Sequence, residues 1–476
     1  MFAASALALA SLSTPAPAQM HMPGMTMPTP RKAPTPKPAA KPPVHKRAEP
    51  RKQPHAAPSA SATMPLDRSP APQPAAPMTM PMPMVSQSGH EIAMLGALGS
   101  YPMQRESSGT SWQPDSSEHM GLMTMSGDWM LMAHGAVNLV YDHQSGPRGD
   151  DKAFASGMLM GMARRPIGNG TLQLKAMLSP DPLMGPSGYP LLLASGETAD
   201  GRTRLIDRQH PHDLFMELSA SLSQDIGSHG SAFLYAGLPG EPAFGPPAFM
   251  HRESIMDSPE APITHHWLDS THISFGVLTA GVILDRFKIE ASRFNGREPD
   301  QHRWNIETGP LDSTSLRLSF NPTSTLALQG SWARLIDPEE LEPGVNQTRW
   351  SASALWARDV SPSWHAAATL AWGRKSSNGH NDDGVAAEAS LKHSDWTVFG
   401  RGEWIENREL VQSEHSPAYR VGKLSFGAIR DFRIIRHLAF GAGGVFSLNF
   451  VPDELSGVYG GHNPTGLMGF VRLKLD

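Results

Sequence analysis

The stretch Asp128–His143, DWMLMAHGAVNLVYDH, decides the fold that we predict for this chain. Its odd-numbered positions are mostly apolar and include Trp129 and Tyr141 near the two ends, whereas its even-numbered positions carry methionine, histidine, asparagine and aspartate. Successive side chains of a β-strand point to opposite faces, so a strand here has one apolar face and one polar face. An apolar face bounded by aromatic residues is typical of a transmembrane strand that faces lipid, with its polar face toward a lumen.

About sixteen segments of the chain show this alternation. We expect strands over approximately 129–143, 153–165, 170–180, 212–225, 230–238, 268–283, 286–295, 311–320, 324–335, 348–359, 364–374, 384–393, 395–406, 418–431, 436–449 and 464–475. The connections alternate between short and long ones. We expect short connections at 166–170, 227–229, 321–323, 361–363 and 394, and long ones at 181–211, 239–267, 296–310, 336–347, 375–383, 407–417 and 450–463.

This regular alternation of connection lengths indicates the class of fold. Bacterial outer-membrane barrels have short periplasmic turns, longer extracellular loops and an even number of strands. A soluble β-sandwich would not alternate so regularly. The sequence therefore predicts an all-β fold over residues 128–476, a transmembrane antiparallel β-barrel of about 16 strands with long extracellular loops.

The composition agrees with a barrel. The chain has 476 residues, a hydrophobic content of 39% and a mean hydropathy of -0.32, which are values too polar for a helical membrane protein. No apolar run of about 18 residues is present, so we expect no transmembrane helix. The chain has no cysteine, which excludes disulfides and thiolate metal sites.

The region before the barrel divides into three parts. Residues 1–18 contain an apolar run that ends in Ala16-Pro17-Ala18, a pattern typical of a signal peptide and its cleavage site. Residues 19–85 are rich in Pro, Ala and Met without a hydrophobic period, which predicts a disordered arm in the periplasm. Residues 86–127 are expected to be a periplasmic or plug-like transition segment. We therefore expect the protein in the outer membrane of a Gram-negative bacterium, in contact with lipid.

The arm carries a group of soft donors at its start, namely Met20, His21, Met22, Met25 and Met27. Thioethers select Cu(I) over hard cations, and methionines in a Pro-rich arm have no core to fill. We interpret this group as a copper site, with compositional drift in a plain spacer as the alternative.

A second group of soft donors lies on the first three predicted strands. The alternation places them on the lumen face together with polar residues of the same phase, and they are Met130, Met132, His134, Met158, Met160, Met162 and Met177. They would line one wall of the lumen in its periplasmic half and could hold or pass copper. The alternative is that the methionines of the second strand face lipid as ordinary apolar residues.

Histidines gather in two neighbouring long loops. The candidates are His210, His212 and Asp213 in the first loop, and His251, His265, His266 and His272 in the second. Neutral imidazoles and carboxylates bind divalent metals, so these residues could form a metal site in loops that fold into the pore. Alternatively, the histidines hydrogen-bond the loop backbone and hold a plug in place.

Four strings of this sequence resemble a known family. They are GTSWQPDSSEHMGLMTMSGDWMLMAHG, LIDRQHPHDLFMELS, GPPAFMHRESIMDSPEAPITHHWLDSTHISFGVLTAG and FNGREPDQHRWNIETGPLDS, and they span about residues 100–476. The chain is similar to a family of uncharacterised Gram-negative outer-membrane β-barrel proteins associated with copper and heavy-metal resistance loci. The family has no established activity, so the resemblance implies the barrel and its compartment and favours copper, without assigning a role to any residue.

Three functions follow from these observations. The first is copper handling, as a channel or a sequestering protein, with Cu(I) or Cu(II) as the only implied metal and no further cofactor. The second is a general or anion-selective pore with an incidental Met-rich arm. The third is a lipid hydrolase in which Ser270 or Ser274 would pair with His272 and Asp269, although no G-x-S-x-G motif surrounds either serine. Nucleic-acid binding is disfavoured because the net charge is -5 and no recognised module is present.

Overall fold

A computed structural model describes residues 95–118, 121–411 and 416–475. The predicted signal peptide and arm, including Met20, His21, Met22, Met25 and Met27, lie outside these residues. A search of the described residues for a helix long and apolar enough to cross a membrane finds none.

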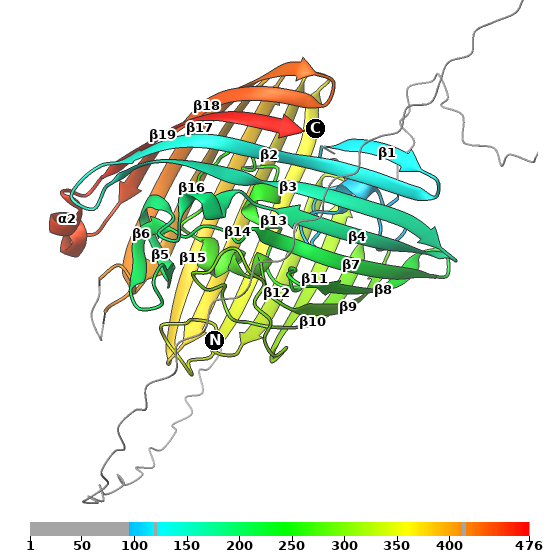
Figure 1. Cartoon of the computed structure of the whole chain (residues 1–476), viewed down its shortest axis with the longest axis horizontal. Helices are drawn as coiled ribbons and strands as arrows, with labels where there is room; N and C mark the ends of the chain where they lie inside the picture. Colours follow the sequence, from blue (N-terminus) through cyan, green and yellow to red (C-terminus); the bar gives the residue numbers. More distant parts are fainter. Residues whose placement is uncertain (1–94, 119–120, 412–415, 476) are drawn as a thin grey trace, which may run out of the picture. The chain divides into compact units, whose positions relative to one another are not determined.

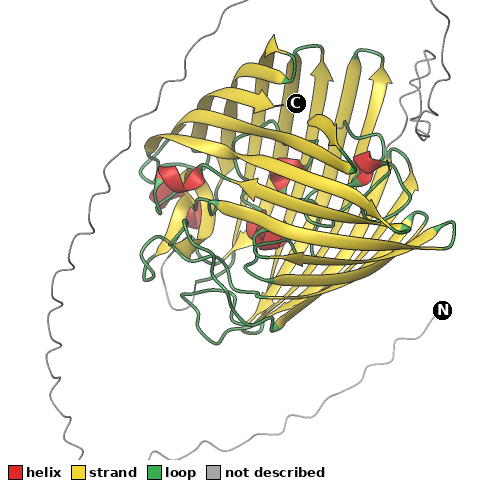
Figure 2. Cartoon of the chain, turned by 45° about the vertical axis from the view of Figure 1, so that its right-hand side comes forward, coloured by secondary structure: helices red, strands yellow, loops and turns green. Residues whose placement is uncertain are grey.

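Nearly all of the regular secondary structure in the described part of the chain is strand (Figures 1 and 2). Their bounds are β1 Leu122–Ser126, β2 Trp129–Gln144, β3 Asp151–Ile167, β4 Gly170–Leu178, β5 Tyr189–Thr198, β6 Arg204–Gln209, β7 Phe215–Ile226, β8 Gly230–Gly237, β9 Val277–Leu284, β10 Phe287–Phe294, β11 Ser313–Thr323, β12 Leu326–Leu335, β13 Gln347–Ser361, β14 Trp364–Ser377, β15 His380–His393, β16 Trp396–Asn407, β17 Tyr419–Ile435, β18 Leu438–Phe450 and β19 Thr465–Leu475. The helices are short, with α1 at His265–Leu268, α2 at Asp453–Tyr459, and 3₁₀ turns η1 at Met103–Arg105, η2 at Asp181–Met184, η3 at Phe249–His251 and η4 at Ser270–His272.

The main sheet closes on itself. It contains 17 of the described strands, and β1 is a short addition to β2, which leaves 17 − 1 = 16 strands around the barrel. Each strand pairs antiparallel with the next, and the ring closes where β19 pairs with β2. Strands β5 and β6 form a separate sheet, so β4 pairs directly with β7. The predicted antiparallel barrel of about 16 strands is confirmed.

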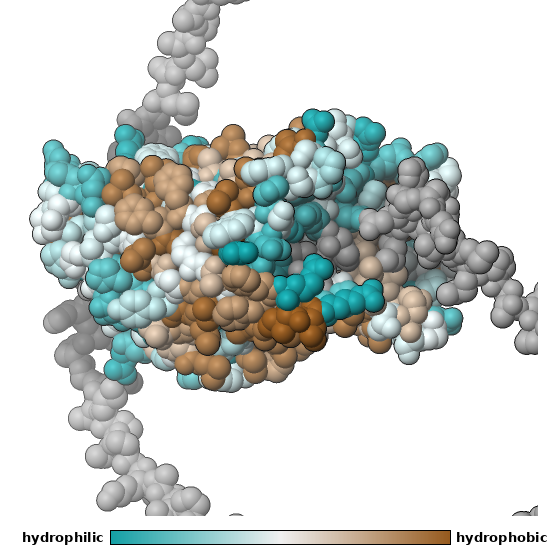
Figure 3. Space-filling view, turned by 90° about the horizontal axis from the view of Figure 1, so that it is seen from above, coloured by the Kyte–Doolittle hydropathy of each residue, from teal (hydrophilic) through white to brown (hydrophobic). Residues whose placement is uncertain are grey.

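The predicted lipid face is the observed one. Along β2, Leu139 on the outer face is 61% exposed, whereas Asp142 on the inner face is fully buried. The other strands repeat this pattern with outward leucines, isoleucines and phenylalanines such as Leu159, Leu234 and Ile289. Figure 3 shows apolar side chains gathered on the middle of the barrel surface, with hydrophilic ones toward the ends. Because a closed barrel satisfies all its backbone hydrogen bonds, this apolar belt can contact the hydrocarbon of a membrane.

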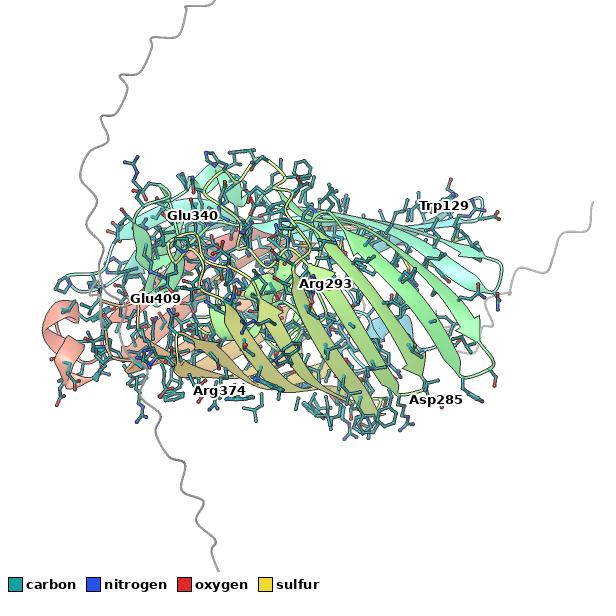
Figure 4. All side chains as sticks on the ribbon, turned by 90° about the horizontal axis from the view of Figure 1, so that it is seen from below. Trp129, Asp285, Arg293, Glu340, Arg374 and Glu409 are labelled. Atoms are coloured by element: carbon teal, nitrogen blue, oxygen red, sulfur yellow. The ribbon has the colours of Figure 1, made fainter. Side chains whose placement is uncertain are left out.

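The two ends of the barrel differ, as predicted. Figure 4 shows Trp129 and Asp285 toward the end that carries the short turns, and Glu340 and Glu409 toward the end that carries the long loops. Several expected boundaries were wrong, and two of them lie at connections predicted to be long. Residues 375–383 are not a long loop, because the pairing of Ser377 with His380 leaves only a two-residue turn. The strand expected from residue 268 begins at Val277, because residues 265–272 form α1 and η4.

A segment before the barrel, residues 95–118, lies against the inner wall, and we call it the N-terminal plug. The backbone carbonyls of Ala97 and Leu98 accept hydrogen bonds of 2.7 and 2.5 Å from the buried hydroxyls of Ser223 and Ser231 on β7 and β8. Two strands further along the same wall, the Thr110 hydroxyl donates to Glu290 on β10 at 2.6 Å. Since these strand residues are on the inner face, the plug occupies the lumen near the short-turn end.

The connection between β8 and β9, residues 238–276, also lies inside the barrel, and we call it the inserted loop. It contacts the inner wall through ion pairs and hydrogen bonds: Ala243 with Ser292 on β10, Ser254 with Thr369 on β14, Arg252 with Glu388 on β15, Thr264 with Glu403 on β16, Glu260 with Lys423 on β17, and Asp257 with Arg472 on β19. These contacts lie around most of the ring of strands. The loop therefore crosses the lumen and fills it instead of standing above the membrane.

One anchor of the inserted loop is Arg252. Its guanidinium is fully buried and donates to Asp269 at 2.5 Å and to Glu388 at 2.8 Å. Removing one partner of a buried ion pair costs about 3–5 kcal/mol, because the remaining charge is left uncompensated. We expect Arg252→Ala to release the loop, so that residues 238–276 become sensitive to protease and the single-channel conductance in a planar bilayer rises above that of the parent.

A matched control is Arg420→Ala, because the Arg420 side chain is 73% exposed and its pair with Glu406 is worth little. This variant should keep the protease resistance and conductance of the parent. The role assigned to Arg252 is wrong if both variants behave alike.

Candidate functional site

Five histidines come together in the lumen, and we call them the histidine cluster: His210, His212, His265, His266 and His272. His210 and His212 follow β6, while α1 and η4 of the inserted loop carry the other three. All five are buried. The ring centroids of neighbouring members lie 5.2 to 6.0 Å apart, with His272 at 5.2 Å from both His212 and His265. The structure thus brings together two loops whose histidines are more than 50 residues apart in the sequence.

The Nδ1 atom of each cluster histidine faces an oxygen that can only accept a hydrogen bond. His212 contacts the Asp181 carboxylate, His265 the Asp269 carboxylate and His272 the Asp269 carbonyl, all at 2.8 Å. His210 lies 3.2 Å from the Glu197 carboxylate and His266 lies 3.3 Å from that of Glu298. In a neutral ring, such a contact places the proton on Nδ1 and leaves Nε2 with a lone pair.

The Nε2 atoms have a different environment. Within the described part of the chain, the buried Nε2 atoms of His210, His212 and His272 have no hydrogen-bond partner. Gly196 packs against one side of the cluster, since a Cβ at this position would lie 2.6 Å from Nε2 of His266. Its φ of +124° also favours glycine at this position. A cavity of about 80 Å³ borders His210 and His212 on another side. Each cluster histidine therefore has a partner at Nδ1, whereas Nε2 of His210, His212 and His272 is buried without a partner among the described residues.

The charge state of the cluster follows from burial. Burial lowers the pKa of His210 and His272 well below the usual range of imidazole, and the neighbouring histidines act in the same direction. Burial also lowers the pKa of His265, with Asp269 acting against it. For His266, the Glu298 carboxylate outweighs burial and raises the pKa. The first three rings are therefore neutral near pH 7, which is the form that binds metals.

Two residues of the predicted group lie elsewhere. Asp213 is buried and accepts a hydrogen bond from Arg303 at 3.2 Å, so its charge is already compensated. His251 lies opposite His134 of β2, with 6.3 Å between the ring centroids. Among the residues in ranges 95–118, 121–411 and 416–475, no group of three or more His, Asp or Glu side chains has the arrangement of a ready-made metal site. Metal binding at the cluster therefore remains a prediction.

The methionines of the wall have the predicted phase. Met132, Met158, Met160 and Met177 are buried, and Met130 and Met162 are half-buried on the same inner face. The register pairs Met132 with Met162, His134 with Met160, and Met160 with Met177. The outward neighbour Leu159 is 51% exposed, so the alternative in which the methionines face lipid is wrong. Three of them, Met158, Met160 and Met177, also pack against Met216, Ile273 and Phe275.

The serines considered for a hydrolase do not pair with His272. Ser270 accepts a hydrogen bond from Arg349 at 2.8 Å, and Ser274 donates to the Thr271 carbonyl at 3.1 Å. A nucleophilic serine must lie within hydrogen-bond reach of its base. Since Nε2 of His272 has no partner among the residues that the structure covers, the triad predicted as an alternative is not formed.

Sequence reasoning missed the residues that orient the histidines. Asp269 had a detectable signal, because it follows His265 by four residues and a helical turn brings such residues together. Asp181, Glu197 and Glu298 come from η2, from β5 and from the connection between β10 and β11. Nothing in their local sequence indicates that they meet the cluster, because their positions depend on how several loops enter the lumen.

The fold and its interior define a class of protein, an outer-membrane β-barrel whose lumen is filled by its own segments. No family model and no curated protein matches the chain. Similar solved structures include OmpT of Vibrio cholerae (7% identity, TM-score 0.41, covering 74% of this chain and 100% of that one) and Salmonella typhi OmpF in complex with daunomycin (11%, 0.48, 74% and 100%). An anion-selective porin of Comamonas acidovorans is also similar (11%, 0.40, 73% and 100%). At these values the similarity concerns the type of fold and transfers no activity.

The acidic anchors of the inserted loop predict how the lumen responds to acid. Burial raises the pKa of Asp257, but Arg472 and Lys474 outweigh it and bring the pKa to about 2. Lys423 and Arg401 likewise outweigh burial and lower the pKa of Glu260. A carboxylate whose pKa is depressed by folding stabilises the fold above its unfolded pKa of about 4, and this contribution is lost as the pH falls through the folded pKa.

We therefore expect the inserted loop to loosen between about pH 4 and pH 2, while the hydrogen-bonded strands stay closed. Hydrogen exchange followed by mass spectrometry can measure this, since peptides from residues 238–276 should lose protection before peptides from β13 to β16. Uniform protection of the loop down to pH 2 would argue against these ion pairs as its anchors.

Proposed function

We propose that this protein is an outer-membrane β-barrel that binds copper inside its occluded lumen, with the histidine cluster as the binding site. In this proposal the protein sequesters or hands on the ion and does not act as an open pore. The proposal joins the copper function expected from the sequence to the residues that fold into the lumen.

The observation that supports this function most is the uniform orientation of the cluster. Metal-binding histidines typically donate their other ring N–H to a carboxylate or a backbone carbonyl, which fixes the tautomer and increases the basicity of the ligating nitrogen. All five cluster histidines have such a partner at Nδ1. Leaving a buried nitrogen unsatisfied costs about 1–3 kcal/mol, so a ligand at Nε2 of His210, His212 and His272 would be stabilising.

Ligand chemistry favours copper among the divalent ions. The interior offers imidazoles and thioethers and, because the chain has no cysteine, no thiolate. Imidazole binds Cu, Zn, Ni and Fe, and Cu²⁺ has the highest affinity of the first-row divalent ions for a given set of nitrogen ligands. Thioethers add a preference for Cu(I). Since the rings do not yet stand in ligand positions, binding requires them to close around the ion.

A general pore is the second candidate. A barrel of 16 strands has the circumference of the porins, which leave an aqueous channel. The inserted loop and the N-terminal plug occupy that space here, so a pore function requires them to move. Conductance of the parent protein separates the two, because a pore conducts in the absence of copper, whereas a barrel that stays occluded does not.

The copper site can be tested on the purified, folded protein by equilibrium dialysis against Cu(II) and by electron paramagnetic resonance. We expect the parent to retain copper with nitrogen hyperfine structure from imidazoles. The double variant His212→Gln, His272→Gln should lose the retained copper and this signal. The matched control is His143→Gln, His229→Gln, whose side chains are 52% and 78% exposed. Equal retention of copper by both double variants would refute the proposal.

Asp181 provides a test of the orienting contacts. The variant Asp181→Asn keeps the size of the side chain but removes the negative charge of the group that accepts the Nδ1–H hydrogen bond of His212. Loss of such a partner typically costs about 10–100-fold in metal affinity. We expect copper to bind more weakly by this factor with the same stoichiometry, whereas an unchanged affinity would mean that Asp181 serves only to hold the loop.

A further inference from the structure

Two cavities beside the methionine wall adjoin one another. The first has a volume of about 100 Å³, and its lining includes Met103, Met132, Met160, Met162, His251 and Met256. The second, of about 80 Å³, is lined by Met158 and Met250 and ends at His210 and His212 of the histidine cluster. His134 and Met256 line both cavities. The two spaces therefore lie next to one another, with His134 and Met256 at their common boundary.

The donors come from three separate parts of the molecule. Met132, Met160 and Met162 belong to β2 and β3, Met103 belongs to the N-terminal plug, and Met250, His251 and Met256 belong to the inserted loop. The wall methionines therefore face further methionines across open space. In contrast, Met177 and Met216 are buried in an apolar cluster and line neither cavity.

The two cations that line the first cavity, Arg164 and Lys175, each have an acidic partner. Arg164 contacts Glu106 at 2.6 Å, and Lys175 lies 3.5 Å from Glu217. Because these cations are neutralised, they do not exclude a second cation from the cavity. The spaces are large enough for a few water molecules or for an ion with part of its hydration shell, but too small for a drug-sized molecule, which needs about 300 Å³ or more.

We propose that the two cavities form one thioether-lined passage that holds a soft monovalent cation, Cu(I) or Ag(I), and leads to the histidine cluster. This inference deepens the proposed copper function and rests on it. Thioethers are uncharged, polarizable ligands that select such ions over hard cations. Met162, Met250 and Met256 are half-buried, so their sulfurs can reorient toward an ion without opening the barrel.

The test uses the full-length folded protein and Ag(I) as a redox-inert probe. The passage variant is Met132→Leu, Met162→Leu, Met256→Leu, since leucine keeps most of the volume of methionine and removes the sulfur. The matched control is Met184→Leu, Met216→Leu, Met468→Leu, three buried methionines that line neither cavity. Equilibrium dialysis measures the Ag(I) bound to each protein, and a parallel dialysis against Cu(II) measures occupancy of the histidine cluster.

We expect the Ag(I) sites of the passage to bind at least about tenfold more weakly in the passage variant, equivalent to about 1.4 kcal/mol, while the control binds Ag(I) like the parent. The methionines of the arm add the same bound Ag(I) to all three proteins and are subtracted as a common contribution. Both variants should keep the Cu(II) of the parent, because the cluster histidines are unchanged. Equal Ag(I) binding by the passage variant and the parent, or an equal loss in the control, overturns the passage while leaving the cluster untouched. A parent that binds neither ion overturns both the passage and the copper function.

Discussion

The structure depends on the pairing of charges inside the barrel. The inner faces of the strands carry ionised side chains that an open, water-filled pore would solvate, among them Glu388, Arg401 and Lys423. Here they are buried, and a buried charge is tolerated only with a partner and further hydrogen bonds. Glu260 of the inserted loop pairs with Lys423 and lies 3.5 Å from Arg401, and Arg252 pairs with Glu388. Barrel wall and inserted loop are therefore complementary in charge, and Glu260, Glu388 and Lys423 each have a partner across the boundary between them.

This complementarity also determines where the candidate site lies. Thr264 and Asp269, which bracket α1, are held by Glu403 and Arg252, so His265 and His266 enter the lumen at a fixed place. His210 and His212 lie in the connection between β4 and β7. Nδ1 of His212 hydrogen-bonds the carboxylate of Asp181 in η2. The site is thus assembled from loops, but those loops are bound to the rigid wall of a barrel. Rigid support of this kind reduces the cost of holding several imidazoles close together.

The sequence predicted the barrel well and its interior only in part. Alternation along β2 and the asymmetry of the connections follow from local rules, so the strand number, the lipid face and the phase of Met132 and Met160 could be read from single segments. The turn at Asn378 was missed because polar residues continue the strands β14 and β15 beyond the apolar belt. Glu197 and Glu298 could not be assigned to the cluster, since their contacts are set by how two distant loops pack within one lumen.

The two nitrogens of the cluster histidines have different surroundings, and this difference relates to both explanations of the interior. A side chain that only holds a plug needs a partner for each of its polar atoms, and the Nδ1 contacts with Asp181 and Asp269 already provide that support. Within the described residues, however, the Nε2 atoms of His210, His212, His251 and His272 lack any partner in buried surroundings. If these four histidines served only as anchors, each would leave a buried nitrogen without a hydrogen bond, which is destabilising. An occupant that accepts nitrogen lone pairs removes the penalty, and a metal ion does so for several rings at once. The proposed copper site would therefore satisfy these nitrogens in the histidine cluster, while the Nδ1 contacts hold the loops in place.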